Sequence, residues 1–186
     1  MKPEFVKINE KKYKINTDFR VALKCDEIAR DETTGEYEKG LAVIYKLFGD
    51  EGLNDKHNHE KLLELGKKYL LRNQEKENDE DPDMDFEQDR GYIKASFFSD
   101  YKLQDIYSVE YMHWYDFYDY LLGLTEDCVL SRVRYIRSLD TSGLTGKELD
   151  ERIKQKKAVE LKKKQKPISE KQSKSANRFL ELAKLK

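Results

Sequence analysis

The sequence predicts a mainly α-helical domain with a small N-terminal β-hairpin and a basic C-terminal helical arm. Three observations lead to this prediction. Apolar residues recur at three- and four-residue spacing through most of the 186 residues, as they do in amphipathic helices. The residues before position 16 instead alternate apolar and polar side chains, which is typical of half-buried strands. Residues 147–186 hold 14 basic and six acidic residues and few apolar ones.

The first expected elements are two short strands that form a hairpin. Asn9 and Glu10 separate the two alternating runs and supply the turn. The apolar positions of the two runs are Phe5, Val6, Ile8, Tyr13 and Ile15. A hairpin of two strands is marginally stable in water, so we expect it to pack against the helical part of the chain.

Three helices are expected between the hairpin and residue 71. The first runs from about 18 to 31, after the helix-capping residues Asn16-Thr17-Asp18. The second ends before Gly49, and the third covers about 62–70. The apolar positions that predict the helices are Phe19, Ala22, Leu23, Cys25, Ile28 and Ala29, then Leu41, Ile44, Tyr45 and Phe48, then Leu62, Leu63, Leu65, Tyr69 and Leu70.

Residues 75–89 form a strongly acidic run, with nine acidic residues and one lysine. Such a run repels itself and is expected to bury little, as a mobile connector or a loop before the next helix. A calcium loop would also need glycine at its sixth position and glutamate at its twelfth. Counted from Asp79, those positions hold Met84 and Arg90, so we expect no dedicated calcium site.

The aromatic residues concentrate between 86 and 122, where 12 of the 21 are found. Their helical spacing predicts a packed core built on helices 86–101, 108–122 and 126–139, with Ser108 and Thr125 as caps. In the third of these helices the residues expected to face inward are Val129, Leu130, Val133 and Ile136. The arginines of the same helix, Arg132, Arg134 and Arg137, are expected mostly to point elsewhere.

The end of the chain is expected to be a basic arm. Thr145 and Glu148 form a capping box that starts a lysine-rich helix reaching about residue 165, with apolar positions too sparse for a strong core face. After Pro167 a final helix ends in the apolar stripe Ala176, Phe179, Leu180 and Ala183. We therefore expect residues 1–140 to form the α-rich core domain, with the acidic loop 75–89, and residues 141–186 to form the arm.

The sequence contains no recognisable catalytic, cofactor or metal site. His57 and His59 are two residues apart with no cysteine near them, and no glycine-rich phosphate loop is present. Cys25 and Cys128 lie in apolar helical patterns, which favours free buried thiols in a reducing compartment. No apolar run approaches the ~18 residues of a membrane span. We therefore expect a cytosolic, non-enzymatic protein without cofactors or membrane contact.

Several spaced segments carry a likeness to a known family. They are Tyr92-Ile93-Lys94-Ala95-Ser96-Phe97 with Tyr101, Met112-His113-Trp114-Tyr115-Asp116-Phe117, Leu121-Leu122-Gly123-Leu124, and Arg134-Tyr135-Ile136-Arg137-Ser138-Leu139-Asp140, with a weaker match at Asp18-Phe19-Arg20. With these segments the chain resembles the bacteriophage gene product fifteen family, which is found in tail-morphogenesis clusters of siphophages and prophages. The acidic run before 89 and the long basic tail depart from the family pattern.

The resemblance implies a phage or prophage tail morphogenesis factor in the cytoplasm of the bacterial host. Family members lie beside the gene for the tape-measure protein, which implies a non-enzymatic tail assembly chaperone. Its expected partners are the tape-measure protein and other tail assembly proteins. It leaves open whether the chain forms a homo-oligomer and whether it stays in the virion. From the residues themselves, we expect the exposed partner-binding segment to contain Phe179, Leu180 and Ala183 together with Lys162, Lys163 and Lys164.

A second reading of the basic arm is contact with phosphates. It would make the chain a phage nucleic-acid-associated protein, or a host-interaction protein of the counter-defence type, acting through the lysines of 147–166. The formal net charge of −1 disfavours nucleic acid as the partner, since the acidic run 75–89 offsets the basic arm. Whether these two segments pair with each other is the question that the sequence leaves open.

Overall fold

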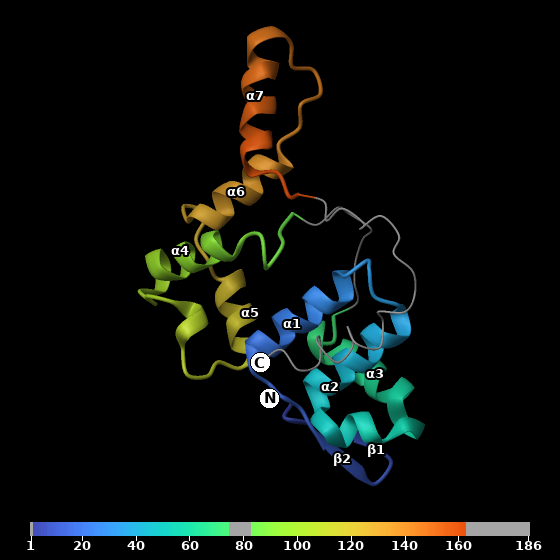
Figure 1. Cartoon of the computed structure of the whole chain (residues 1–186). Helices are drawn as coiled ribbons and strands as arrows, with labels where there is room; N and C mark the ends of the chain where they lie inside the picture. Colours follow the sequence, from blue (N-terminus) through green and yellow to red (C-terminus); the bar gives the residue numbers. More distant parts are fainter. Residues whose placement is uncertain (1, 75–82, 163–186) are drawn as a thin grey trace. The chain divides into compact units, whose positions relative to one another are not determined.

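The computed structural model describes residues 2–74 and 83–162, which contain two β-strands and seven α-helices (Figure 1). These residues divide into two compact units. Unit 1 comprises residues 2–74 and 111–117, and unit 2 comprises residues 83–110 and 118–162. Helix α5, Trp114–Leu122, begins in unit 1 and ends in unit 2. The predicted fold class, mainly helical with a small N-terminal hairpin, is confirmed.

Unit 1 opens with the predicted hairpin. Strand β1, Phe5–Ile8, pairs antiparallel with strand β2, Lys11–Lys14, and Asn9 adopts a positive φ of 53° in the turn. Ile8 and Tyr13 are buried on the face that lies toward helix α2. The hairpin thus gains the helical support that two strands need.

Helix α1, Phe19–Arg30, begins at the predicted cap, because the Asp18 carboxylate accepts a hydrogen bond from the Arg20 N–H at 2.9 Å. Helix α2, Glu36–Asn54, packs against both α1 and helix α3, His59–Leu70. A short 3-10 helix, η1 Lys56–Asn58, joins α2 to α3. The first and third predicted helices are confirmed to within a few residues.

The second helix was expected to end before Gly49, and the backbone does leave the helical conformation at that glycine, which has φ 63° and ψ −156°. A second helical part, which was not predicted, follows it and extends α2 to Asn54. Residues with side chains are strained in this region of the backbone, whereas glycine adopts it readily. Gly49 therefore ends the first helical part of α2 and turns the chain into the second part.

Residues 111–117 complete unit 1, and they explain why the helix expected from Ser108 begins later. The Phe19 N–H donates to the Met112 carbonyl at 3.0 Å, and the Trp114 N–H donates to the Thr17 carbonyl at 2.8 Å. These bonds hold the chain before Trp114 extended, so the prediction of a helix start at Ser108 is wrong. Phe117 then stacks on Phe19 with ring centroids 4.5 Å apart.

Unit 2 is built on helix α4, Arg90–Tyr101, helix α6, Val129–Ser138, and helix α7, Gly146–Val159. A short 3-10 helix, η2 Ile106–Ser108, follows α4. Helix α6 contacts both α4 and α7. The side chains buried in this unit include Ile93, Phe97, Ile106, Leu121, Leu130 and Val133.

Three predicted boundaries in unit 2 are wrong. Helix α6 does not begin at 126 behind Thr125, because Thr125 bonds instead to the Asp100 carboxylate, at 2.8 Å from its N–H and 3.0 Å from its hydroxyl. The cap of α6 is Cys128, and Val129 is exposed. Helix α4 begins at Arg90 and not at 86, and α7 ends at Val159 and not near 165.

The expectation that the aromatic region forms one core is wrong. Trp114 and Phe117 are buried in unit 1 and Phe97 in unit 2, while Phe98, Tyr111 and Tyr120 are exposed. Cys25 and Cys128 are free and buried, as predicted. Burial raises the pKa of the Cys25 thiol to about 12. Within the described ranges, none of the helices has the length and apolar character required to span a bilayer.

Candidate functional site

The expected partner-binding residues reach the described part of the chain only at its end. Phe179, Leu180, Ala183, Lys163 and Lys164 lie outside the described residues, and Lys162 is the last residue before them. The Lys162 N–H donates to Gln88 Oε1 at 2.8 Å, and the Lys162 carbonyl accepts a bond from Gln88 Nε2 at 3.1 Å. One side-chain amide therefore holds the main chain of Lys162 through both of its polar groups.

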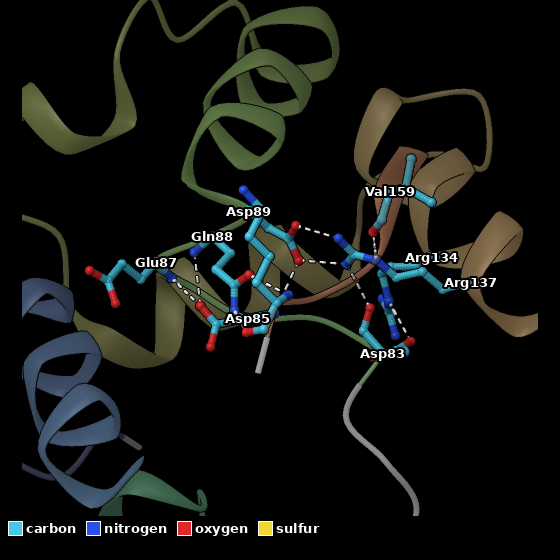
Figure 2. A network of polar contacts seen from close by, with 9 residues as sticks. Asp83, Asp85, Glu87, Gln88, Asp89, Arg134, Arg137 and Val159 are labelled. Atoms are coloured by element: carbon cyan, nitrogen blue, oxygen red, sulfur yellow. Dashed lines mark hydrogen bonds and ion pairs between the residues drawn. The ribbon is translucent and has the colours of Figure 1, made fainter. Parts of the chain in front are cut away.

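Gln88 belongs to a polar network in unit 2 that links the residues before α4 to α6 and to the chain after α7 (Figure 2). The network consists of Asp83, Asp85, Glu87, Gln88, Asp89, Arg134, Arg137, Val159 and Lys162. It is the candidate functional site because it holds Lys162, the residue from which the basic segment, residues 162–186, continues.

The centre of the network is a buried ion pair between Asp89 and Arg137. Arg137 Nη1 and Nη2 each donate to one Asp89 carboxylate oxygen at 2.7 Å. The Asp89 side chain is 1% exposed and the Arg137 side chain is 10% exposed. Hydrogen bonding to Asp89 raises the pKa of the Arg137 guanidinium above its usual value. This two-pronged geometry is the strongest arrangement available to an arginine and a carboxylate.

Arg137 also bonds to two main-chain carbonyls. Its Nε donates to the Val159 carbonyl at 2.6 Å, and its Nη1 donates to the Asp83 carbonyl at 2.9 Å. One guanidinium thus joins the residues before α4, the end of α6 and the end of α7 (Figure 2). The planar fork of an arginine permits this, since it presents five N–H groups in fixed directions.

Arg134, one turn earlier on α6, makes the outer contact of the network. Its Nε donates to the Asp83 carboxylate at 2.7 Å. Both side chains are about half exposed, at 42% and 50%. Solvent screens such a pair, so it contributes much less stability than the buried pair beside it.

The local sequence places Asp89 at this position. The Asp85 carboxylate accepts bonds from the N–H groups of Glu87 and Gln88 at 3.0 and 2.8 Å, which closes a turn. The Asp85 N–H in turn donates to Asp89 Oδ2 at 3.0 Å. Asp89 occupies the N-cap position of α4, where the exposed N–H groups favour a negative charge. This turn is the reason that α4 begins at Arg90 and not at 86.

Two expectations about these residues are therefore wrong. Asp85 and Asp89 are buried, although the acidic run was expected to bury little. Arg137 points into the network, although the arginines of this helix were expected mostly to point elsewhere. The available signal was the spacing of Arg134 and Arg137, which places both on one side of a helix that could face the acids at 83 and 89.

The geometry answers part of the question about charge pairing. Within residues 83–89, the acidic side chains Asp83 and Asp89 pair with arginines of α6. The contact with the start of the basic segment runs through the main chain of Lys162 and the neutral side chain of Gln88. Residues 75–82 lie outside the described residues.

The arrangement is suited to holding chain segments together. Both oxygens of the buried Asp89 carboxylate accept bonds from Arg137. Among residues 2–74 and 83–162, no group of three or more His, Cys, Asp and Glu side chains is placed to hold a metal ion.

The comparisons with known proteins identify the family. Residues 2–161 match the family described as Bacteriophage Gp15 protein. Searches of curated proteins and of solved structures gave no significant match. The matched region includes both units and the network up to Val159, and it ends one residue before Lys162. The chain belongs to the Bacteriophage Gp15 protein family.

Proposed function

We propose that this phage-family protein is a non-enzymatic tail assembly chaperone that binds the tape-measure protein in the cytoplasm of the bacterial host. The observation that carries the proposal is the family match over residues 2–161. The polar network is consistent with this role, because its buried carboxylate is engaged by an arginine and by a main-chain N–H. Such a carboxylate supports structure better than it supports proton transfer.

Exposed apolar side chains on the helices support a binding function. In unit 2 they include Phe98 on α4, Leu122 at the end of α5 and Tyr135 on α6, of which Leu122 is 62% exposed. A long amphipathic helix, such as a tape measure, presents a continuous apolar stripe that side chains of this kind can cover. The described part of the chain therefore carries candidate contacts for the partner.

The basic segment adds a second set of contacts in this proposal. Lys162 is held by Gln88, and the chain continues from there through Lys163 and Lys164 to Phe179, Leu180 and Ala183. This segment lies beyond the region that matches the family. We therefore assign it a supporting role, in which it strengthens a complex that residues 2–161 can form.

The test is coexpression of the full chain with the tape-measure protein encoded in the same phage genome. The proposal expects the tape measure to move into the soluble fraction and to elute with this chain in gel filtration. A tape measure that stays insoluble beside an abundant soluble chain would contradict the proposal. Migration of the chain with nucleic acid and not with the tape measure would also contradict it.

A double substitution in the basic segment tests its supporting role. Phe179→Ser with Leu180→Ser removes the apolar stripe and should weaken the complex without changing the melting temperature. The control is Lys184→Ser with Lys186→Ser, which also replaces two residues of this segment by serine but keeps the apolar stripe. Equal losses in both variants would contradict a specific apolar contact of this segment. They would not contradict the proposal that residues 2–161 form a complex with the tape measure.

A further inference from the structure

The outer face of the hairpin in unit 1 carries more positive than negative charge from the part of the chain that the structure describes. In the register of the two strands, Phe5 is opposite Lys14 and Lys7 is opposite Lys12. Because side chains alternate along a strand, these four share the face opposite to buried Ile8 and Tyr13. All four are exposed, Phe5 by 51%. The face therefore combines three lysines with one exposed aromatic ring.

The charges on this face are poorly compensated within the described residues. Lys7 lies 3.9 Å from Glu10, whose side chain is fully exposed. Lys12 and Lys14 have no carboxylate within ion-pair distance among the described residues. Like charges placed directly opposite each other destabilise a strand pair, and Lys7 with Lys12 is such a pair. An arrangement that opposes hairpin stability in the free protein is suited to a bound negative charge.

One edge of the same hairpin, that of β1, is unpaired within residues 2–74 and 83–162. The Ile15 N–H donates to the Glu4 carbonyl at 2.8 Å, so the bonded pairs of this antiparallel ladder fall at Glu4, Val6 and Ile8 of the first strand. The N–H and C=O groups of Phe5 and Lys7 consequently point away from β2. No described residue forms a hydrogen bond with these main-chain groups.

The second strand of the hairpin, β2, is supported by helix α2. Strand β2 contacts this helix, and the chain directly after β2 bonds to it, because the Asn16 N–H donates to the Leu47 carbonyl at 2.7 Å. An added strand would therefore join at β1. Two strands are marginal, and a third strand extends the ladder.

We propose that the open edge of β1 binds an extended acidic segment of a partner protein as a third strand. The added strand would place acidic side chains beside Lys7 on the outer face, and apolar side chains beside Val6 and Ile8 on the inner face. Its main chain would bond to the free groups of Phe5 and Lys7, which is the strand-addition mode of peptide recognition. A second copy of β1 would bring another lysine and no acidic side chain to this edge, so it fits the positive face less well than an acidic segment does. The proposal uses no residue of the basic segment, so it stands independently of the proposed function.

The probe is a blocked ten-residue peptide of alternating glutamate and valine, labelled with a fluorophore and titrated with the full-length protein. Anisotropy should report saturable binding that weakens as salt is raised, since salt screens exposed charges. A peptide of the same charge with proline in place of valine should not bind, because proline cannot donate to a ladder and does not fit strand pairing. Equal binding of the two peptides would overturn strand addition, as would no binding of either.

The variant that separates binding from folding is Lys12→Glu with Lys14→Glu. Lys12→Glu places a carboxylate opposite Lys7, so the hairpin should be at least as stable as before. The affinity for the glutamate–valine peptide should nevertheless fall by about tenfold, because the outer face then carries two carboxylates and one lysine in place of three lysines. An unchanged affinity in a folded variant would overturn the proposal.

The control for net charge is Lys56→Glu with Lys61→Glu, on η1 and α3, which changes the total charge by the same amount on exposed positions. It should bind the peptide like the wild type, and an equal loss would overturn a site on the hairpin. Titration with a ten-residue oligothymidylate completes the test. Tighter binding of this oligonucleotide than of the peptide would assign the face to nucleic acid and overturn the proposal.

Discussion

Asp89 and Arg137 form a buried ion pair with two hydrogen bonds of 2.7 Å, although 48 positions separate them in the chain. Asp89 occupies the N-cap position of α4, and Arg137 lies in the last turn of α6. Each charge therefore sits at the helix end that it stabilises, since helix starts favour anions and helix ends favour cations. The pair holds α4 and α6 together by charge at both helix termini.

Replacement of Arg137 by methionine should strongly destabilise the protein. Methionine fills much of the space of the arginine stem but leaves the Asp89 carboxylate buried without its partner. Loss of one member of a buried pair costs ~3–5 kcal/mol. Urea unfolding followed by circular dichroism measures this loss. The double variant with Asp89→Asn should recover part of it, because the buried charge is then removed as well.

Arg134→Met is the matched control on the same helix. The pair of Arg134 with Asp83 is about half exposed, and such surface pairs contribute between about 0 and 1 kcal/mol. The variant should therefore unfold at nearly the wild-type urea concentration. A cost equal to that of Arg137→Met would show that burial is not what makes the inner pair important.

Gln88→Ala should loosen the start of the basic segment without unfolding the protein. It removes both hydrogen bonds to the Lys162 main chain, which lies at an exposed site. Each such bond contributes ~1 kcal/mol at most in water. Hydrogen exchange at the Lys162 amide should become faster, while the urea midpoint changes little. Unchanged exchange would contradict a holding role for Gln88, and Gln104→Ala, at another exposed glutamine of unit 2, is the control.

The sequence predicts those parts of the fold whose causes are local. The hairpin and α1 follow from strand alternation, a two-residue turn and an Asp cap, all of which lie within a few residues of their effects. The start of α5 could not be predicted, because it depends on hydrogen bonds between residues 17–19 and 112–114. Propensity favours a helix after Ser108, and this distant pairing overrides it.

The same distinction applies to the candidate site. The basic character of the C-terminal segment and the acidic character of 75–89 are visible in composition. The pairing of Asp89 with Arg137 is not, because sequence spacing does not say which acid of a run meets which arginine of a helix. Gln88 carries no charge, so a search for charged pairs does not find it, although it is the side chain that contacts Lys162.

Asp55 should make stability depend on acid pH. Hydrogen bonds from Tyr13, Lys11 and Asn58 lower the pKa of its carboxyl from 3.8 to about 2. A carboxyl with a lowered folded-state pKa adds stability above its unfolded-state pKa, and this stability is lost as pH falls through the folded-state value. The difference in urea midpoint between wild type and Asp55→Asn should thus narrow between pH 4 and pH 2. A constant difference across this range would contradict the assignment.

Tyr13→Phe tests the cause of that shift. The Tyr13 hydroxyl makes the largest contribution to the lowered pKa of Asp55, and phenylalanine keeps the buried ring while removing this donor. The pKa of Asp55, followed by carboxyl-carbon NMR, should move from about 2 toward 3.8. An unmoved pKa would assign the shift to Lys11 and Asn58 instead.

Gly49 and Gly91 should respond in opposite directions to the same substitution. A Cβ at either position would meet no atom within 4 Å, so steric crowding does not distinguish them. Gly49 has φ 63° and ψ −156°, a conformation that alanine adopts only with strain, and Gly49→Ala should cost about 1–3 kcal/mol. Gly91 lies in the first turn of α4, where alanine is the better helix former, and Gly91→Ala should stabilise the protein by roughly 0.5 kcal/mol. Thermal unfolding of the two variants should therefore shift the melting temperature down and up, respectively. A neutral Gly49→Ala would mean that α2 can pass this position as a regular helix, and the kink would then have another cause.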